Sequence, residues 1–153
     1  METGWHHSDG GLRMVSPGSE GTPNTYCLST DDRKDWWHGP SIFLNSICME
    51  VGKAYEFSTR MRLALGNTGG ASCDTAAKYG DMRCPHGSIK TIKDGIKTSE
   101  QWGLFNAIGP WTDGAWNPFS GVFVVDDAMV DADQVILYIH RLREGVNIQL
   151  DDT

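Results

Sequence analysis

Ala54-Tyr55-Glu56-Phe57-Ser58-Thr59-Arg60-Met61-Arg62-Leu63 is the stretch whose pattern decides the fold class. Tyr, Phe, Thr, Met and Leu alternate in it with Glu, Ser, Arg and Arg. Successive side chains of a β-strand point to opposite faces, so one face of this segment is apolar and the other is polar. The stretch therefore predicts a strand with one face in the core and one face in solvent.

Short segments of the same kind lie on both sides of this strand. Turn signals separate them at intervals of roughly ten residues, as at Gly52-Lys53, Asp94-Gly95 and Glu144-Gly145, and no convincing amphipathic helix occurs. The pattern predicts an all-β fold, an antiparallel β-sandwich. The other expected strands or strand-like segments are 12–15, 26–29, 88–93, 102–108, 121–125, 135–140 and 146–150.

Length and composition favour a single domain. The chain has 153 residues, 13 basic and 20 acidic, and a net charge of -7. That charge argues against a partner with a phosphate backbone or an anionic lipid surface, so we expect neither nucleic acid nor membrane as a partner. No apolar run approaches the roughly 18 residues of a membrane span. We expect a soluble, monomeric domain over residues 1–153, with residues 66–87 as a loop insertion.

The four cysteines indicate an oxidising environment. Cys73 and Cys84 bracket a Gly- and Asp-containing loop that a disulfide would staple, and Cys27–Cys48 is the most plausible second bridge. Zinc is the competing use, but no two cysteines have the close spacing of a zinc knuckle. Disulfides favour an extracellular setting. The N-terminus has no signal pattern, so secretion requires a leader that this chain does not contain.

Residues 31–44 combine paired tryptophans with charged residues. Trp36 and Trp37 follow Arg33 in a segment that is too polar to be core throughout. A tryptophan offers a flat apolar face and arginine a planar fork of donors, which suits a sugar ring with its C–H face and hydroxyl rim. The alternative is structural: one tryptophan of the pair plugs the core while the other faces solvent.

The order of several motifs resembles a known group of proteins. These motifs are Arg33-x-x-x-Trp37-x-Gly39-Pro40, then Gly52-Lys53-x-Tyr55-x-Phe57-Ser58-x-x-Met61-Arg62, Trp116-x-x-x-Ser120-Gly121, Leu137-Tyr138-Ile139 and Ile148-Gln149-Leu150-Asp151-Asp152. Over residues 5–152 the chain resembles carbohydrate-binding modules of the family 4, 9 and 22 type, which are galactose-binding-like jelly rolls usually attached to secreted glycoside hydrolases. The resemblance implies non-catalytic binding of a polysaccharide such as β-glucan or xylan, in an extracellular protein.

The resemblance also implies site residues. Trp37 aligns with the motif tryptophan and is the expected stacking platform, with Trp36 as the fallback. Tyr138 and His140 are expected to contact sugar, with His140 where many relatives carry an acidic residue, so binding would be sensitive to pH near 6 to 7. Arg33, Arg60 and Arg62 are candidate hydroxyl donors; for Arg60 and Arg62 the alternative is a solvated charge ladder with Glu56. Trp116 and Gly121 are expected to be structural.

Besides His140, the N-terminus departs from the family pattern, and this departure puts the family's metal site in doubt. Members of the group usually begin with an additional strand that ends in an acidic residue, whereas this chain opens almost at Gly4-Trp5, so we expect the domain to lack that first strand. The resemblance implies a structural calcium ion held by N-terminal loops and by the first acid of the closing pair, Asp151. Without the first strand, most companions of Asp151 would be missing.

Enzyme signatures are absent from the sequence, which contains no Gly-x-Ser-x-Gly, no His-Glu-x-x-His and no phosphate loop. We therefore expect no catalytic residues. Two other functions stay open. The sandwich could be a structural or adhesion module that contacts protein, which a large exposed apolar patch would favour. It could also be a small polysaccharide-cleaving jelly roll, which needs two carboxylates about 5 to 10 Å apart across a cleft.

Overall fold

The computed structural model describes residues 5–7, 11–15, 26–66 and 70–151. Within these ranges the chain is almost entirely β-structure, with one 3₁₀ turn and one short helix. The elements are β1 Trp5–His7, β2 Gly11–Val15, β3 Cys27–Asp31, β4 Pro40–Leu44, η1 Ser46–Cys48, β5 Ala54–Leu65, β6 His86–Lys93, β7 Ile96–Ala107, β8 Asn117–Val124, α1 Asp127–Asp131, β9 Gln134–His140 and β10 Val146–Asp151.

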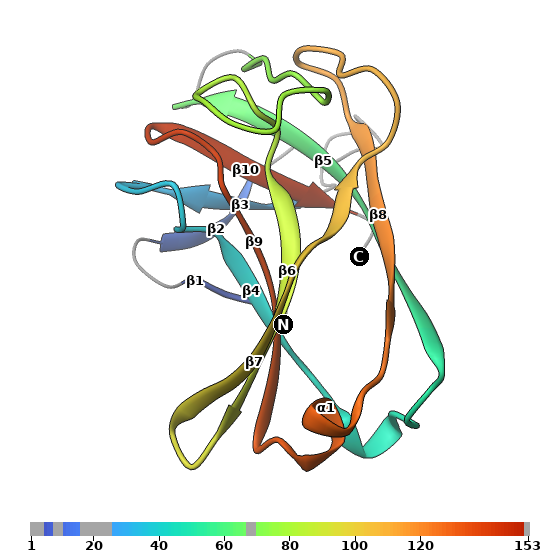
Figure 1. The fold of residues 1–153 in the computed structure, drawn as a ribbon. Helices are drawn as coiled ribbons and strands as arrows, with labels where there is room; N and C mark the ends of the chain where they lie inside the picture. Colours follow the sequence, from blue (N-terminus) through green and yellow to red (C-terminus); the bar gives the residue numbers. More distant parts are fainter. Residues whose placement is uncertain (1–4, 8–10, 16–25, 67–69, 152–153) are drawn as a thin grey trace.

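The strands form an antiparallel ladder in the order β1-β4-β9-β6-β7-β8-β5-β10-β3-β2. The long strand β7 joins two layers, because it pairs with β6 from Ile96 to Asn106 while Phe105–Ala107 also pair with β8. β4, β9 and β6 belong to one layer, and β5, β10 and β3 belong to the other (Figure 1). The ladder thus folds over into a sandwich, and the prediction of an all-β antiparallel sandwich is confirmed.

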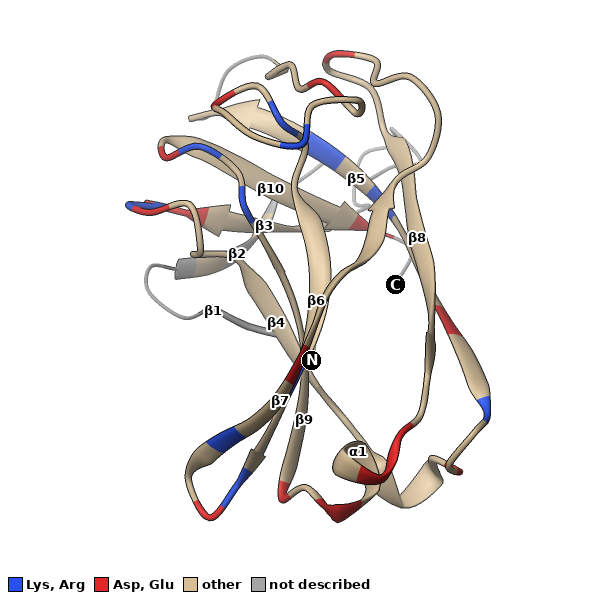
Figure 2. Cartoon of the chain, in the orientation of Figure 1, with Lys and Arg blue, Asp and Glu red and all other residues tan. Residues whose placement is uncertain are grey.

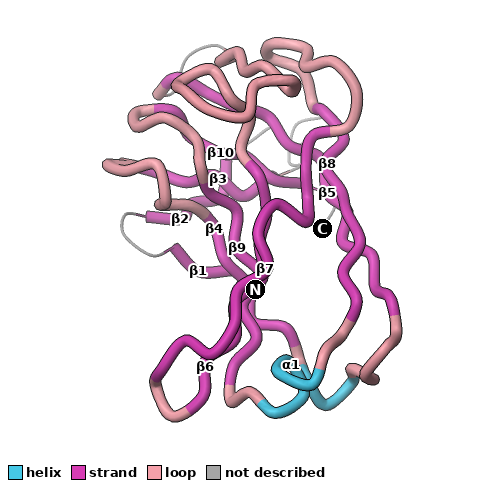
Figure 3. The backbone as a smooth tube through the Cα atoms, in the orientation of Figure 1, coloured by secondary structure: helices cyan, strands magenta, loops and turns pink. Residues whose placement is uncertain are grey.

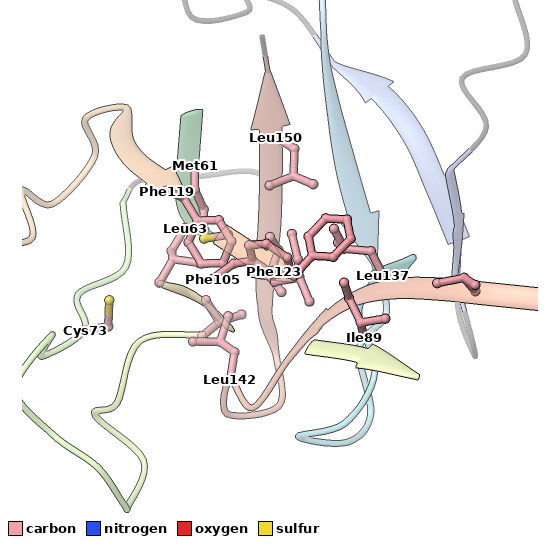
Figure 4. Packing of buried hydrophobic residues seen from close by; sticks show 14 of the residues in the cluster. Met61, Leu63, Cys73, Ile89, Phe105, Phe119, Phe123, Leu137, Leu142 and Leu150 are labelled. Atoms are coloured by element: carbon pink, nitrogen blue, oxygen red, sulfur yellow. The ribbon is translucent and has the colours of Figure 1, made fainter. Parts of the chain in front are cut away.

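The core lies between the two layers. One continuous cluster contains Ile89 and Leu137 from the first layer and Met61 and Leu150 from the second, each at most 2 % exposed. Phe105, on the strand that joins the layers, is completely buried among them (Figure 4). Burial of apolar surface on this scale is the main favourable contribution to folding.

The alternation of residues 54–63 is confirmed. In β5 the apolar series ends in buried Met61 and Leu63, while Glu56, Ser58 and Arg60 are exposed. Strand β10 differs from the expected half-buried pattern, since Val146–Leu150 are all buried. It lies between β5 and β3, and on its polar face the side chain of Gln149 accepts a hydrogen bond from Arg62 of β5.

Two short strands and two turns of helix were not predicted. β1 pairs with β4 at the edge of the first layer. With three residues, β1 is too short to show a two-residue period in the sequence. α1 forms inside the expected acidic connection 126–133, where the side chain of Asp126 accepts the backbone N–H of Met129 as an N-cap. None of the described helices is long and apolar enough to cross a membrane.

The cysteine predictions have opposite outcomes. Cys73 and Cys84 form a disulfide, as predicted. The second bridge is wrong, because Cys27 and Cys48 are free thiols. Cys27 is buried in β3 of the second layer, whereas Cys48 is exposed in η1, beside α1 at one end of the sandwich (Figure 3). The expectation that both cysteines flank the tryptophan stretch on strands therefore fails at Cys48.

A long connection between β5 and β6 crosses the opposite end of the sandwich. The chain leaves β5 after Leu65, and Ala71 and Cys73 return into the core before β6 begins at His86. The disulfide closes this connection, and Arg143 Nη1 donates to the carbonyl of Ser72 at 3.1 Å. That residues 66–87 are an insertion, and that the first family strand is lacking, stay predictions.

Charge is distributed unevenly between the two ends. Acidic residues surround α1, while the β5–β6 connection and the loop between β9 and β10 carry arginines at the other end (Figure 2). The two loops at that end carry Lys78, Arg83, Arg141 and Arg143 alongside Asp74, Asp81 and Glu144.

Candidate functional site

A groove of about 340 Å³ lies on the outer face of the β4–β9–β6–β7 layer. Alternation in β9 explains its position: Leu137 and Ile139 point into the core, so Ile136, Tyr138 and His140 point outward. The tryptophan pair enters from the segment before β4. The described residues that line the groove are Trp36, Trp37, Gly39, Ser41, Phe43, Lys90, Lys97, Glu100, Trp102, Ile136, Tyr138 and His140.

Strand pairing arranges the floor of this groove in rows. In one row Ser41 lies opposite Tyr138, which lies opposite Ser88 on the next strand. In the next row Ile136 stands between Phe43 and Lys90. Direct neighbours across antiparallel strands have Cβ atoms about 5 Å apart, so these side chains form a continuous surface. The floor is therefore set by the register of the sheet, and the walls by loops and β7.

Four large aromatic side chains remain accessible around the groove. Trp37 and Phe43 are each 50 % exposed, Trp102 is 49 % exposed and Trp36 is 39 % exposed. The rings of Trp36 and Trp37 meet edge to face, with centroids 5.2 Å apart and an interplanar angle of 81°. The structural alternative, in which one tryptophan of the pair plugs the core, is wrong: both are on the surface.

Arg141 holds two of these aromatics in place. Its guanidinium carbon lies 5.0 Å from the ring centre of Trp36 and 4.5 Å from that of Trp102. Its backbone has φ 68° and donates its N–H to the carbonyl of Trp36. A non-glycine residue in this left-handed region is uncommon and requires support from its surroundings. Cation–π contacts of this kind restrain the rings without covering all of their faces.

The polar groups of the groove centre on Glu100. Its carboxylate accepts the hydroxyl hydrogen of Tyr138 and the ammonium of Lys97, the latter at 2.6 Å. Burial raises the pKa of Glu100, but the two hydrogen bonds and the charges of Lys97 and Lys90 outweigh it, so the pKa lies below its ordinary value. Burial and Glu100 together raise the pKa of Tyr138. Glu100 is therefore a carboxylate and Tyr138 a neutral phenol at neutral pH.

His140 is a buried member of this surface. It is 1 % exposed, its Nε2 lies 2.8 Å from Ser88 Oγ, and its ring stacks near Tyr138, with centroids 4.4 Å apart. Burial, followed by the charges of His86 and Arg141, lowers its pKa to about 3. The predicted sensitivity of binding to pH near 6 to 7 through His140 is therefore wrong, because this imidazole is neutral throughout that range.

Arg33 has a structural position instead of a place in the groove. It is 3 % exposed, and its guanidinium donates five hydrogen bonds to backbone carbonyls. Three of these, to Leu142, Arg143 and Val146, join the tryptophan segment to the β9–β10 loop and the first residue of β10. Every N–H of the fork is used, so Arg33 has no donor left for a hydroxyl. It shapes the segment that carries Trp36 and Trp37 and does not itself line the groove.

Arg60 and Arg62 lie on the other layer. Both are on β5, where Arg60 is exposed and pairs in register with Asp151. Arg62 donates from Nε to the side-chain oxygen of Gln149 at 2.7 Å and lies over the ring of Trp116, 4.6 Å from its centre. The structure therefore separates both arginines from Trp37, Tyr138 and His140, which it brings together.

The expected calcium ligand, Asp151, ends β10. Its backbone carbonyl accepts a hydrogen bond from Thr59 Oγ1 at 2.8 Å, and its cross-strand neighbour is the cation Arg60. Among residues 5–7, 11–15, 26–66 and 70–151, no three His, Cys, Asp or Glu side chains converge on a point that could hold a metal ion. Much of the N-terminal segment that would supply the remaining ligands lies outside the described residues.

Trp102, Phe43, Lys90 and Glu100 line the groove but were not predicted as site residues. Trp102 was missed because alternation does not tell which face of residues 102–108 lies outside: Trp102 and Leu104 fall on one face, Phe105 and Ala107 on the other. Beside Trp102 the strand is also irregular, with residues 102–104 opposite the single residue Ser88 and Gly103 at φ 65°. The signal in the sequence was the glycine beside an aromatic residue within an otherwise strand-like segment.

Comparison with family profiles and with curated proteins yields no match for this chain. Solved structures do match. The first xylan-binding module (CBM22-1) of Paenibacillus barcinonensis Xyn10C is 17 % identical, with a TM-score of 0.62 over 98 % of this chain and 83 % of that one. The second (CBM22-2) is 13 % identical, with a TM-score of 0.65 over 99 % and 89 %.

A third similar structure is the C-terminal family 22 carbohydrate-binding module of Clostridium thermocellum Xyn10B. It is 13 % identical, with a TM-score of 0.63 over 99 % of this chain and 84 % of that one. Identities this low show a shared fold and do not carry over a ligand or a binding residue. The fold implied by the sequence resemblance is confirmed: the chain has the fold of the family 22 carbohydrate-binding modules.

Proposed function

We propose that the chain is a non-catalytic module that binds a polysaccharide of the xylan type in the groove on the β4–β9–β6–β7 layer. The observation that carries the proposal is the ring of half-exposed aromatics, Trp36, Trp37, Phe43 and Trp102, around polar side chains on one rigid face of the sandwich. Flat apolar rings bordered by hydrogen-bonding groups match the two kinds of surface that a sugar offers.

Energetics favour a modest affinity. A stacked ring contributes about 0.5–1.5 kcal/mol beyond its buried area, and a flexible glycan loses ordering entropy when it binds. The groove offers several aromatic positions, so successive sugar units of one chain would each contribute a little. The aromatic rings are already positioned by Arg141 and by each other, which reduces the entropy lost on binding.

The proposal that the module is not an enzyme rests on the state of Glu100. A glycosidase needs two carboxylates across a cleft, one of which is a general acid with a raised pKa. Glu100 is the carboxylate among the described residues that line the groove, and its pKa is lowered by Lys97 and Tyr138 after burial is taken into account. A paired carboxylate of this kind suits hydrogen bonding to hydroxyls better than proton donation.

Xylan is the favoured ligand because the similar solved structures are described as xylan-binding domains. β-Glucan, which the sequence resemblance also implied, is the second polysaccharide to test. Both are chains of pyranose rings whose C–H faces can stack on aromatic side chains. They differ in the hydroxymethyl group, which glucose carries and xylose lacks. The residues that we expect to contact the glycan are Trp37 first, then Trp36, Trp102, Phe43, Tyr138 and Glu100, with His140 supporting Tyr138 from beneath.

Replacement of Trp37 tests the proposal. Trp37→Ala removes a half-exposed ring from the wall of the groove, so retardation of the protein in gels that contain xylan should be lost while circular dichroism shows an intact fold. Tyr26→Ala is the matched control, since Tyr26 is 53 % exposed and does not line the groove. Equal retardation of a folded Trp37→Ala and of wild type would contradict the site.

Failure of wild type to bind any glycan in a broad panel would instead favour the structural or adhesion module. In that case the exposed aromatics of the groove would be a contact surface for protein. Binding followed by release of shortened glycans would favour the polysaccharide-cleaving alternative. Measurement of reducing ends after incubation with xylan distinguishes this outcome from simple binding.

An extracellular location within a larger secreted protein is the setting that we propose. The Cys73–Cys84 disulfide supports it, since disulfides persist in oxidising compartments. A binding module of modest affinity is most useful when it holds an attached enzyme near its substrate, because tethering raises the effective concentration.

Calcium at Asp151 stays a prediction. If the ion binds there, calcium should raise the melting temperature of wild type but not of Asp151→Ala, because a hard cation needs several oxygen ligands and the carboxylate would be one of them. An equal rise in both proteins would place any bound calcium elsewhere.

A further inference from the structure

A second cavity adjoins the groove. It has a volume of about 460 Å³ and lies between the disulfide-closed β5–β6 connection and the ends of β6 and β7. His86 lines this cavity and His140 lines the groove; the two residues are register partners, and their ring centres lie 4.7 Å apart. Arg83 also lines the cavity, and its guanidinium carbon lies 5.6 Å from the ring centre of Trp36 in the groove. The two hollows therefore share a wall.

The lining of this cavity is basic. Lys78, Arg83 and His86 contribute nitrogen donors, and none of the described residues that line the cavity is acidic. This contrasts with the net charge of -7 for the whole chain. Asp81 acts on Arg83 electrostatically but does not line the cavity, and it is opposed by the like charge of Arg141. The cavity thus gathers positive charge without an opposing carboxylate among the described residues of its wall.

Two nitrogens in this region are buried without a hydrogen-bond partner among the described residues, His86 Nε2 and Arg141 Nε. Buried polar atoms are nearly always paired in folded proteins, so an exception calls for an explanation, and a bound ion nearby is one. Burial and then the charges of Arg141 and Arg83 lower the pKa of His86 to about 4. A bound anion in the cavity would relieve this repulsion.

We propose that this cavity binds the carboxylate of an acidic substituent, of the uronic acid class, on the polysaccharide whose main chain lies in the groove. The inference rests on the proposed function, because the shared wall matters only if a glycan occupies the groove. Arg83 presents a planar donor fork, Lys78 adds a second positive charge and Asn106 offers an amide to the hydroxyls of the substituent. Neutral substituents would leave these charges without a partner.

The inference is tested with three polymers: unsubstituted xylan, glucuronoxylan, and the same glucuronoxylan after reduction of its carboxyl groups to alcohols. Calorimetry at low salt should show wild type binding glucuronoxylan about tenfold more tightly than the reduced polymer, as expected for charge-assisted hydrogen bonds. Equal affinities for the two would overturn the inference and leave the proposed function intact. Binding to none of the three would refute the proposed function and, with it, this inference.

Lys78→Gln separates a local site from general electrostatic attraction. Lys78 is exposed, lines the cavity and does not line the groove, so this variant should bind unsubstituted xylan as wild type does but lose most of the preference for glucuronoxylan. Lys53→Gln removes the same charge at the exposed turn before β5, far from the cavity, and should retain the preference. An equal loss in both variants would assign the preference to net charge and overturn the site.

His86 gives a direct spectroscopic readout. A xylooligosaccharide with one glucuronic acid should raise the pKa of His86, followed by its ring proton shifts in NMR, whereas the undecorated oligosaccharide of equal length should not. The sign follows because a carboxylate nearby stabilises the imidazolium. An unchanged His86 pKa in the presence of a bound decorated oligosaccharide would overturn the assignment of the carboxylate to this cavity.

Discussion

Arg33 is a structural residue and not a ligand-binding one. Its neighbourhood in sequence, beside two tryptophans, suggested ligand binding, yet all of its donors are used within the protein. Burial lowers its pKa to about 10, with Asp35 opposing the shift, so the guanidinium remains charged at neutral pH. A buried cation is tolerated here because carbonyl dipoles replace its lost hydration. Arg33 therefore contributes to the groove indirectly, through the backbone of the loop that presents Trp36 and Trp37.

His140 leads to a prediction about stability and pH. Its folded-state pKa of about 3 lies below the unfolded value of about 6.5, so the unfolded chain binds more protons between these values, and stability falls as pH falls through this window. His140→Asn should be less stable than wild type at pH 7, but the difference should shrink by about 2 kcal/mol at about pH 4.5. Urea unfolding at the two pH values measures this.

The groups that face His140 are part of that expectation. His86, Arg141, Arg83 and Lys90 all disfavour its protonation, after burial itself. Ser120→Ala, on β8 of the other layer, serves as the control, since it removes no titrating group. A stability difference between His140→Asn and wild type that stays constant over the range would show that His140 is not held neutral.

By the same argument, the affinity for xylan should not change between about pH 6 and pH 7.

At the scale of elements, two glycines allow strands to approach each other. A Cβ built on Gly121 would lie 2.0 Å from the carbonyl oxygen of Leu104, where β8 meets β7. On Gly39 it would lie 1.8 Å from the carbonyl oxygen of Ile139, where the tryptophan segment meets β9. Both glycines belong to the motifs that carry the family resemblance. At both contacts a Cβ would overlap a backbone carbonyl, so only glycine fits there.

Gly121→Ala should therefore destabilise the protein by about 3 kcal/mol, at the upper end of the cost of overpacking, because backbone atoms of β7 cannot rotate away from the new methyl group. Thermal unfolding followed by circular dichroism measures the loss. Gly52→Ala is a useful comparison. A Cβ at position 52 would have no atom within 4 Å, so this variant measures only the backbone strain of an alanine at φ 82°. A melting temperature of Gly121→Ala equal to that of wild type would show that β7 and β8 can separate without cost.

At the scale of the whole molecule, the loop end of the sandwich depends on the disulfide. The β5–β6 connection has few regular hydrogen bonds, and the bridge spans a sequence separation of 11 residues. Closing a loop of this length stabilises a fold by about 3 kcal/mol. Cys84→Ser should lower the melting temperature accordingly, and reductant should affect wild type but not the variant. Identical melting of wild type with and without reductant would contradict this role.

Several properties of the protein follow from the sequence by itself. The two-residue period of residues 54–63 and 135–140 is a local property, because the faces of a strand alternate whatever it pairs with. The β-sandwich and the placement of Tyr138 outside the core follow from it. The bridge between Cys73 and Cys84 was also predictable, since both residues lie in one loop.

Other properties depended on which strands and loops meet. Cys27 and Cys48 flank one segment in sequence. In the structure Cys27 lies in β3 of the second layer and Cys48 lies in η1 at one end of the sandwich, so proximity along the chain did not bring them together. Which face of β7 meets the core, and therefore the exposure of Trp102, is decided by how β7 pairs with β6 and β8. The lowered pKa of His140 and the basic cavity beside it come from burial and from charges contributed by distant segments. Pairing, desolvation and electrostatic fields are long-range effects, and only the tertiary structure decided them.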